Sequence, residues 1–189
     1  TRRAWALHLL MALKSTIFKA ELQIADMDRN YYQAHSLTLA RHPSETDERM
    51  MVRLLAFALF ADERLEFGRG LSAEDQPALW LKDLTGAVDL WIEVGLPDER
   101  EIRKACGKAN RVAVLCYGGR GADLWWNQNR DRLERLRNLV VMSLPTAASQ
   151  GLAALANRNM SLQCTIQDGQ AWLTDGERTV HIEPVALPG

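Results

Sequence analysis

The sequence predicts an α/β protein built on a mixed β-sheet with flanking helices, and three observations support this fold class. Residues 112–116 form a continuous apolar run, which is typical of a strand covered on both faces in a parallel sheet. Segments with helical spacing lie on either side of that run, so helix and strand alternate along the chain. Asp-Gly pairs between alternating segments near the C-terminus indicate antiparallel hairpins in addition.

The first two elements are expected to form a β-hairpin. Residues 12–24 alternate for the most part between apolar and polar side chains, as a strand does when one of its faces is buried. The segment Asp26-Met27-Asp28-Arg29-Asn30 supplies turn-forming residues, and residues 31–41 resume an extended pattern.

A buried helix is expected next. Ser44 with Asp47 approximates a capping box, and apolar residues at helical spacing continue to about Ala61. After Met50 the segment is apolar nearly all round, which predicts that this helix lies inside the domain. A short strand at residues 65–67 follows it.

The middle of the chain contains the α/β unit. Residues 79–82 and 88–94 flank a turn and favour a second hairpin, with a helix over residues 76–83 as the alternative. The elements after this hairpin alternate, and their crossovers are expected to be right-handed. They are a helix over residues 97–107, a strand at 112–116, a helix over 122–136 and a strand at 139–144.

A helix over residues 147–156 and an antiparallel meander complete the prediction. Asp168-Gly169 and Asp175-Gly176 separate the strands of this C-terminal meander. We expect a single mixed sheet with the meander along one side. Its central strands are expected at residues 89–94, 112–116 and 139–144, and the meander strands at 162–166, 170–174 and 178–183.

Length and composition indicate one globular domain. The chain has 189 residues, and we expect the domain over residues 11–189. Residues 1–10 are expected to be an upstream or artificial extension, because the strand pattern begins directly after Met11. No apolar run reaches the roughly 18 residues that a membrane span requires, so no membrane partner is expected.

The cysteines indicate the cellular compartment, and the charge balance limits how the chain could contact nucleic acid. Cys106, Cys116 and Cys164 are widely spaced among apolar neighbours, which is typical of buried free thiols in a cytoplasmic protein. The chain carries 23 basic and 24 acidic residues, whereas a protein that coats nucleic acid is usually far more basic. Any contact with nucleic acid must therefore rest on a local patch.

Carboxylates at the ends of predicted elements are the candidate site residues. Glu48 lies in the first turn of the buried helix, Asp75 lies in a polar loop, and Glu93 lies between Ile92 and Val94. An ionisable group between two apolar residues is costly to bury unless it points outward or is paired, so Glu93 is the most informative of the three. The sequence has no Walker or GxGxxG loop, no GxSxG elbow and no Cys/His spacing for zinc.

Four motifs follow one another in the first half of the chain. They are Arg41-His42-Pro43-Ser44-Glu45 leading into Glu48-Arg49, Phe67-Gly68-Arg69-Gly70-Leu71, Asp75-Gln76-Pro77-Ala78-Leu79-Trp80, and Trp91-Ile92-Glu93-Val94-Gly95 followed by Pro97-Asp98. Together they resemble the YaeQ family of bacterial proteins, and the similarity runs from about Met11 to the end. The resemblance implies a compact variant of the PD-(D/E)xK nuclease core.

The resemblance also implies a set of roles. The nuclease superfamily places a helix glutamate, a strand-end aspartate, a (D/E)xK strand and a following helix around one or two Mg²⁺ ions. Glu48 is similar to the first of these and Ile92-Glu93-Val94 to the third. The lysine expected two residues after Glu93 is replaced by Gly95, and Lys104 in the next helix is the natural substitute.

Geometry selects the second carboxylate. Asp89 and Glu93 lie four residues apart on one strand, which separates their Cα atoms by ~13 Å, too far for both to bind one ion. Asp75 returns close to Glu93 if the hairpin at residues 79–82 is correct. We therefore expect Asp75 as the ligand and keep Asp89 as an outer alternative.

Two functions remain open, and the sequence does not decide whether the chain is an enzyme. In the first, Glu48, Asp75 and Glu93 hold Mg²⁺ within about 8 Å of one another, Lys104 orients the attacking water, and Arg69 grips a phosphodiester of DNA or RNA. In the second, the chain retains the charged cleft but lacks the motif lysine. The chain is then a non-catalytic, transcription-related module that binds nucleic acid or a protein partner.

Overall fold

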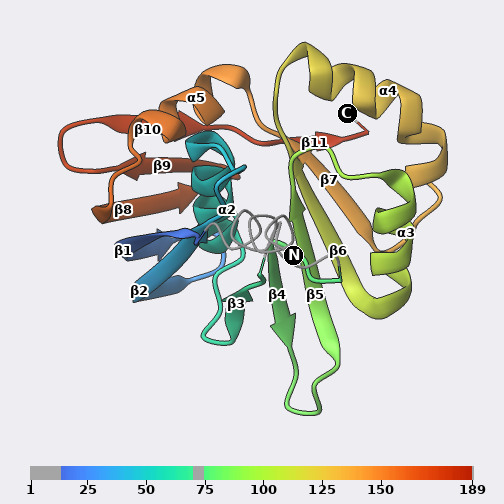
Figure 1. The fold of residues 1–189 in the computed structure, drawn as a ribbon, viewed down its shortest axis with the longest axis horizontal. Coiled ribbons are helices and arrows are strands. Elements are labelled where there is room, and N and C mark those ends of the chain that lie inside the picture. The colour runs from blue at the N-terminus through green and yellow to red at the C-terminus, as the bar shows by residue number, and fades with distance from the viewer. Residues whose placement is uncertain (1–13, 70–74, 189) are drawn as a thin grey trace, which may run out of the picture.

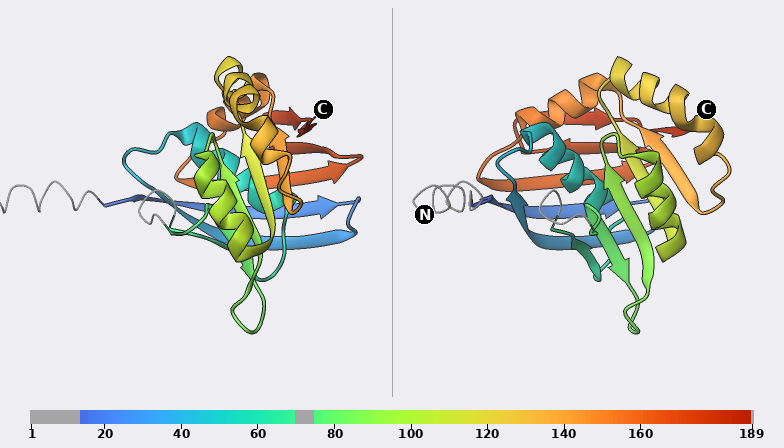
Figure 2. Two further views of the ribbon diagram at one scale, coloured as in Figure 1. Left: turned by 90° about the vertical axis from the view of Figure 1, so that its right-hand side faces the viewer. Right: turned by 45° about the vertical axis from the view of Figure 1, so that its right-hand side comes forward.

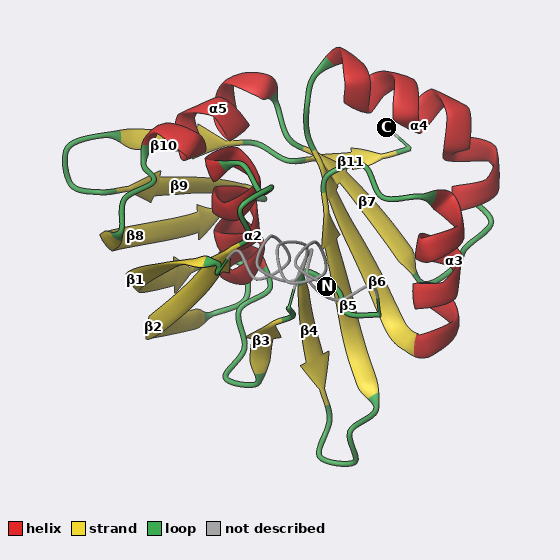
Figure 3. Cartoon of the chain, in the orientation of Figure 1, coloured by secondary structure: helices red, strands yellow, loops and turns green. Residues whose placement is uncertain are grey.

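A computed structural model describes residues 14–69 and 75–188 of the chain (Figure 1). Four layers lie side by side in this part of the molecule: a sheet, a pair of helices, a second sheet and a second pair of helices (Figures 1 and 3). The predicted start at Met11 and the extension over residues 1–10 lie outside the described residues, as do Gly70 and Leu71 of the second motif.

The described strands form two sheets rather than the single mixed sheet that the sequence led us to expect. The five-stranded sheet has the order β10-β9-β8-β1-β2 and combines the N-terminal hairpin with the C-terminal meander. Both of those elements were predicted and are confirmed. This sheet contains β1 (Thr16–Asp26), β2 (Tyr31–Arg41), β8 (Asn159–Gln167), β9 (Gln170–Thr174) and β10 (Thr179–Ile182).

The error in the predicted assembly has a physical cause. β1 pairs with β8 in parallel, with Leu22 opposite Leu162, so the meander joins the hairpin instead of the central parallel strands. Apolar and polar side chains alternate along each of these strands, so each strand has one apolar face. Leu22 and Leu162 are both buried, so the pairing covers both apolar faces together against the helix layer.

The six-stranded sheet has the order β11-β7-β6-β5-β4-β3. β5, β6 and β7 are parallel to one another and central, as predicted, and residues 112–116 are buried throughout. β4 pairs antiparallel with β5, so the hairpin is confirmed and the alternative helix over residues 76–83 is wrong. The strands are β3 (Leu65–Phe67), β4 (Leu79–Lys82), β5 (Val88–Val94), β6 (Ala109–Cys116), β7 (Leu139–Ser143) and an unpredicted β11 (Val185–Leu187).

Helices fill the space between the sheets and cover the outer face of the six-stranded sheet. α2 (Asp47–Leu59) and α5 (Thr146–Ala154) pack against each other between the sheets, which explains why α2 is buried nearly all round. α3 (Glu99–Lys108) and α4 (Arg120–Leu133) lie on the far side of the six-stranded sheet (Figure 2). The strands of one sheet run nearly across those of the other in both views of Figure 2.

The start of α2 differs from the prediction in one detail. The residue that caps the helix is Thr46, whose side-chain oxygen accepts a hydrogen bond from the Arg49 backbone N–H at 3.1 Å. Ser44, the predicted cap, instead bonds to the His42 ring through its hydroxyl group at 2.6 Å. The helix start predicted from the sequence was therefore early by two residues.

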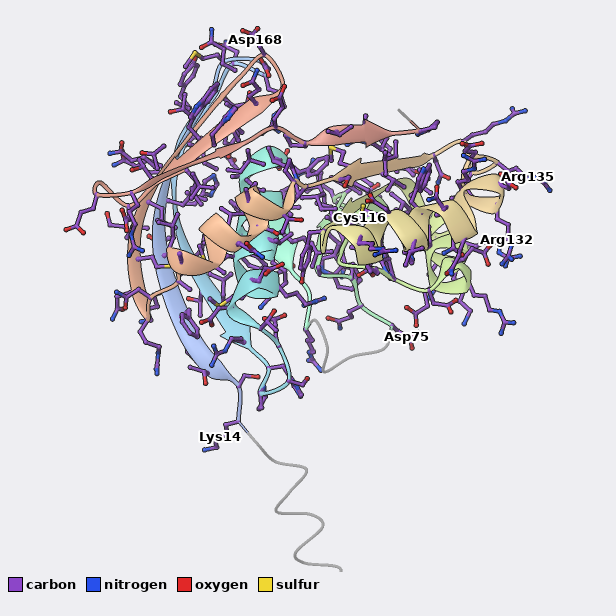
Figure 4. The ribbon with its side chains drawn as sticks, turned by 90° about the horizontal axis from the view of Figure 1, so that it is seen from above. Lys14, Asp75, Cys116, Arg132, Arg135 and Asp168 are labelled. Atoms are coloured by element: carbon purple, nitrogen blue, oxygen red, sulfur yellow. The ribbon has the colours of Figure 1, made fainter. Side chains whose placement is uncertain are left out.

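The cysteine prediction is confirmed. Cys106, Cys116 and Cys164 are unbridged; the second and third are buried and the first is partly exposed. Figure 4 shows Cys116 in the interior of the molecule. Among the helices of the described residues, none is both long enough and apolar enough to cross a membrane.

Candidate functional site

The candidate site lies where the parallel strand β5 ends. In open α/β sheets, ligands bind outside the carboxyl ends of the parallel strands. Glu93 is the penultimate residue of β5, and the next strand, β6, ends just before Tyr117. The chain turns at Gly95, which has φ of 96° and donates its backbone N–H to the Leu115 carbonyl oxygen at 2.9 Å.

The backbone at Gly95 bears on the lysine that the resemblance led us to expect at this position. A φ of 96° lies in a region that residues with a Cβ atom rarely adopt, so a lysine at this position would strain the backbone. The absence of lysine at position 95 therefore has a local structural reason.

A pocket of about 330 Å³ lies between β5, α3 and the segment that leads into β4. The positions that α3 contributes are three and four residues apart, so one face of this helix forms one wall. Charged and aromatic side chains dominate the lining, which includes Asp75, Trp91, Glu93, Glu101, Lys104 and Lys108.

Glu93 is the most perturbed carboxyl group in this pocket. Burial raises its pKa from 4.5 to about 7, and the charge of Glu101 adds to the rise. A hydrogen bond from the Trp91 indole Nε1 to Oε1 at 2.9 Å, the backbone N–H of Ala78 and the charge of Arg49 act in the opposite direction. Glu93 therefore exchanges its proton near neutral pH, as a general acid or base does.

The other charges in the pocket are more exposed. Asp75 is exposed at the start of the described segment that follows residues 70–74, and Figure 4 labels it there. Lys104 and Lys108 are exposed on α3, and the Lys108 Nζ atom lies 5.9 Å from the centre of the Trp91 ring. Carboxylates and ammonium groups thus face the same space, which suits a ligand that carries a phosphate and a cation.

The structure brings three of the predicted site residues to this pocket, Asp75, Glu93 and Lys104. Glu48 does not line it. Glu48 lies near Tyr117, the residue that follows β6. Burial raises the pKa of Tyr117, and the negative charge of Glu48 contributes to that rise.

Arg69 and Asp89 lie outside the pocket lining as well. The Arg69 backbone N–H donates to the Gln76 Oε1 atom at 3.0 Å, which holds Arg69 beside the segment that carries Asp75. Asp89 accepts a hydrogen bond from the Asn110 side chain at 2.9 Å, near the opposite end of β5 from Glu93.

No preformed metal centre is found among residues 14–69 and 75–188. No three His, Cys, Asp or Glu side chains in these ranges are grouped closely enough to hold an ion. Glu48, Asp75 and Glu93 do not form such a group.

Two charged residues of the pocket and one buried carboxylate outside it were not predicted from the sequence. Glu101 and Lys108 could have been found from their spacing on α3, because they lie on the same face as Lys104. Glu45 belongs to the first motif, but its polar segment gave no indication that it is buried. It is nevertheless only 6% exposed, and its two oxygens pair with Arg49 and with the buried Arg53.

Known proteins resemble this chain over nearly its whole length. A crystal structure of the YaeQ protein from Xanthomonas axonopodis pv. citri has a TM-score of 0.89 and 52% sequence identity, over 92% of this chain and 98% of that one. The YaeQ structure from Pseudomonas syringae has a TM-score of 0.86 and 37% identity, over 93% and 97% of the two chains.

Two proteins found by sequence similarity have the same name as these structures. Proteins of Salmonella typhi and Escherichia coli K12, each with the name "uncharacterized protein YaeQ", are 52% and 51% identical over 176 residues, which is 93% of this chain and 97% of theirs. The model of the YaeQ protein family matches residues 11–184. The four motifs, the shared fold and this coverage show that the chain belongs to the YaeQ family.

Proposed function

We propose that the chain is a metal-dependent phosphodiesterase that acts on nucleic acid, with its chemistry in the pocket beside Glu93. The observation that carries the proposal is the meeting of Asp75, Glu93 and Lys104 in one pocket. The chain also passes through α2, the strands β3 to β5 and α3 in the order that the resemblance to PD-(D/E)xK nucleases implies. A carboxylate pair and a lysine are the parts that this chemistry requires.

The donor set fits Mg²⁺. This ion prefers carboxylate oxygens and keeps several waters, so one or two protein carboxylates are sufficient to hold it. Asp75 and Glu93 are the proposed ligands, and Glu101 is near enough to the pocket to assist. Glu48 lies outside the pocket lining, so the proposal does not depend on it.

The hydrolysis of a phosphodiester would divide between the ion and the side chains of the pocket. A Mg²⁺ ion held by Asp75 and Glu93 would lower the pKa of a bound water and offset negative charge on a phosphodiester. Lys104 orients the attacking water. Glu93, whose burial raises its pKa to about 7, gives up its proton when it binds the ion as a carboxylate. Arg69 contacts a non-bridging phosphate oxygen.

The approach of Arg69 depends on the glycine before it. A Cβ atom added at Gly68 would lie 2.0 Å from the Pro77 carbonyl oxygen, so only glycine allows the two segments to lie this close. The Gly68 backbone N–H donates to the Ala78 carbonyl oxygen at 3.0 Å. These contacts bring Arg69 beside the segment between Asp75 and β4.

Titration calorimetry with Mg²⁺ and Mn²⁺ tests the metal site directly. We expect binding at millimolar ion that is lost in Glu93→Gln and retained in Asp89→Asn, a matched change at the other end of β5. Hydrolysis of bis(p-nitrophenyl) phosphate should fall by about 100-fold in Glu93→Gln. The absence of metal binding in the wild-type protein would refute the enzyme proposal.

The second candidate is a non-catalytic binding module, and Gly95 favours it, because the (D/E)xK lysine is absent from its usual place. In that case labelled oligonucleotides bind without being cleaved in either metal. A cytoplasmic location remains a prediction, supported by the three unbridged cysteines.

A further inference from the structure

We infer that the exposed basic face of α3 and α4 binds the sugar-phosphate backbone of nucleic acid and leads it to the pocket beside Glu93. We call this face the basic track and define it by Arg100, Arg103, Lys104, Lys108, Arg132 and Arg135. The inference rests on the proposed function for the identity of the pocket. It adds the surface on which the substrate lies and the class of contact that holds it.

Charge is unevenly distributed along the chain. Between Asp98 and Arg137 there are ten basic and six acidic residues, whereas the rest of the chain has 13 basic and 18 acidic residues. A protein that is nearly neutral as a whole thus concentrates positive charge on one structural unit. Such a patch attracts a polyanion and orients it as it approaches.

The basic residues of α3 point in two directions. Lys104 and Lys108 line the pocket. Arg103 lies on the side that faces α4 and bonds to Glu99 through its Nη2 atom at 2.9 Å. Positive charge therefore continues from the pocket around the outer surface of α3.

Glu99 connects the two helices. Its Oε2 atom also lies 3.8 Å from the Nη1 atom of Arg132, on α4. Figure 4 shows Arg132, in the last turn of α4, and Arg135, just after the helix, on the side of the molecule away from the five-stranded sheet. The basic side chains of α3 and α4 therefore lie next to one another at Glu99.

The track is accessible to a ligand. The side chains of Arg103 and Arg132 are 59% and 65% exposed, while that of Glu99 beneath them is 9% exposed. The arginines thus present their outer nitrogens to solvent although they share a buried carboxylate. Guanidinium groups in this state bind phosphate oxygens in pairs of hydrogen bonds.

The chemistry favours a phosphodiester polymer over an acidic protein or an anionic membrane. The track ends in a pocket in which carboxylates and lysines face each other, an arrangement suited to one phosphodiester and a cation. A nucleic acid supplies phosphates at regular intervals both in that pocket and along the arginines.

Fluorescence anisotropy with a labelled 20-nucleotide single strand, and with its duplex, tests the inference in the presence of EDTA, so that binding is measured without cleavage. The double variant Arg103→Glu/Arg132→Glu should weaken binding at least tenfold at 0.1 M salt. Arg103→Gln/Arg132→Gln should weaken it less and lower the salt slope by about 1.4 for the single strand, as expected for two lost contacts. Circular dichroism checks that each variant is folded.

The matched control is Lys19→Glu/Arg178→Glu, which makes the same charge change at exposed positions of the chain outside the track. We expect its affinity to stay within twofold of the wild type. Equal losses in both reversal variants, or no binding by the wild type, would overturn the track. Binding of the wild type to vesicles with anionic lipid, but not to oligonucleotides, would also overturn it and point to a membrane surface.

Hydrolysis of bis(p-nitrophenyl) phosphate separates the two proposals, because this small ester does not reach the track. If the wild type hydrolyses it but binds no oligonucleotide, the track fails and the phosphodiesterase survives. If the wild type binds oligonucleotides through the track but hydrolyses neither substrate, the phosphodiesterase fails and the track belongs to a binding module.

Discussion

The buried carboxylate of Glu45 and the partly buried carboxylate of Glu93 both lie within the influence of the Arg49 charge, but their other partners differ. Glu45 pairs with Arg49 and Arg53, so each of its oxygens faces a guanidinium. Glu93 receives hydrogen bonds from neutral groups, the Trp91 indole and the Ala78 backbone, and only the more distant charge of Arg49. Full ion pairing stabilises the fold, whereas incomplete compensation leaves Glu93 ready to exchange a proton or bind a cation.

The largest expected effect concerns Glu45. Glu45→Gln leaves Arg53, whose side chain is 3% exposed, without its counter-charge. We expect a loss of about 3–5 kcal/mol in the free energy of unfolding, measured by urea denaturation. Asp47→Asn is the control, because Asp47 is 47% exposed and its pair with Arg41 should contribute less than about 1 kcal/mol. Equal effects of the two changes would contradict a structural role for Glu45.

The negative charge of Glu93, unlike that of Glu45, is expected to lower the free energy of unfolding. Its folded pKa of about 7 lies above the ordinary value of 4.5, so below pH 4.5 both states hold the proton and burial of the ionised group costs nothing. Between pH 4.5 and 7 the unfolded state releases its proton first, and the free energy of unfolding falls as pH rises. Above pH 7 the full cost, at most about 3 kcal/mol, is present.

Glu93→Gln removes this cost. We expect the variant to be more stable than the wild type at pH 8, by up to about 3 kcal/mol, and equally stable at pH 4. Denaturation at pH 4, 6 and 8 measures the difference. A variant that is less stable than the wild type at pH 8 would show that Glu93 has a stabilising ion pair and belongs with Glu45.

The smallest expected effect concerns the turn that follows Glu93. Gly95→Ala should destabilise the fold by about 1–2 kcal/mol, because alanine is strained at a φ of 96°. Gly107→Ala is the matched control, since a Cβ atom there meets nothing and the residue lies in α3; a gain of up to about 1 kcal/mol is expected. If the two variants were equally stable in thermal melts, the turn would not explain the absence of lysine.

The sequence by itself determined the local elements, because the spacing of apolar residues and the turn-forming residues are properties of neighbouring positions in the chain. The apolar run at residues 112–116 is the continuously buried stretch of β6. Asp168 and Gly169 have φ of 52° and 72°, as a two-residue hairpin turn requires. Asp75, Glu93 and Lys104 were also singled out from the sequence, through motif resemblance and residue chemistry, before their shared pocket was known.

Only the tertiary structure decided which elements lie together. The parallel pairing of β1 with β8 joins segments at opposite ends of the chain, and local periodicity contains no information about partners that far apart. The burial of Glu45 and the raised pKa of Glu93 likewise depend on side chains brought in by other elements. Desolvation and ion pairing depend on the folded surroundings of a side chain. A glutamate therefore stabilises the fold at position 45, whereas at position 93 its pKa is raised to about 7.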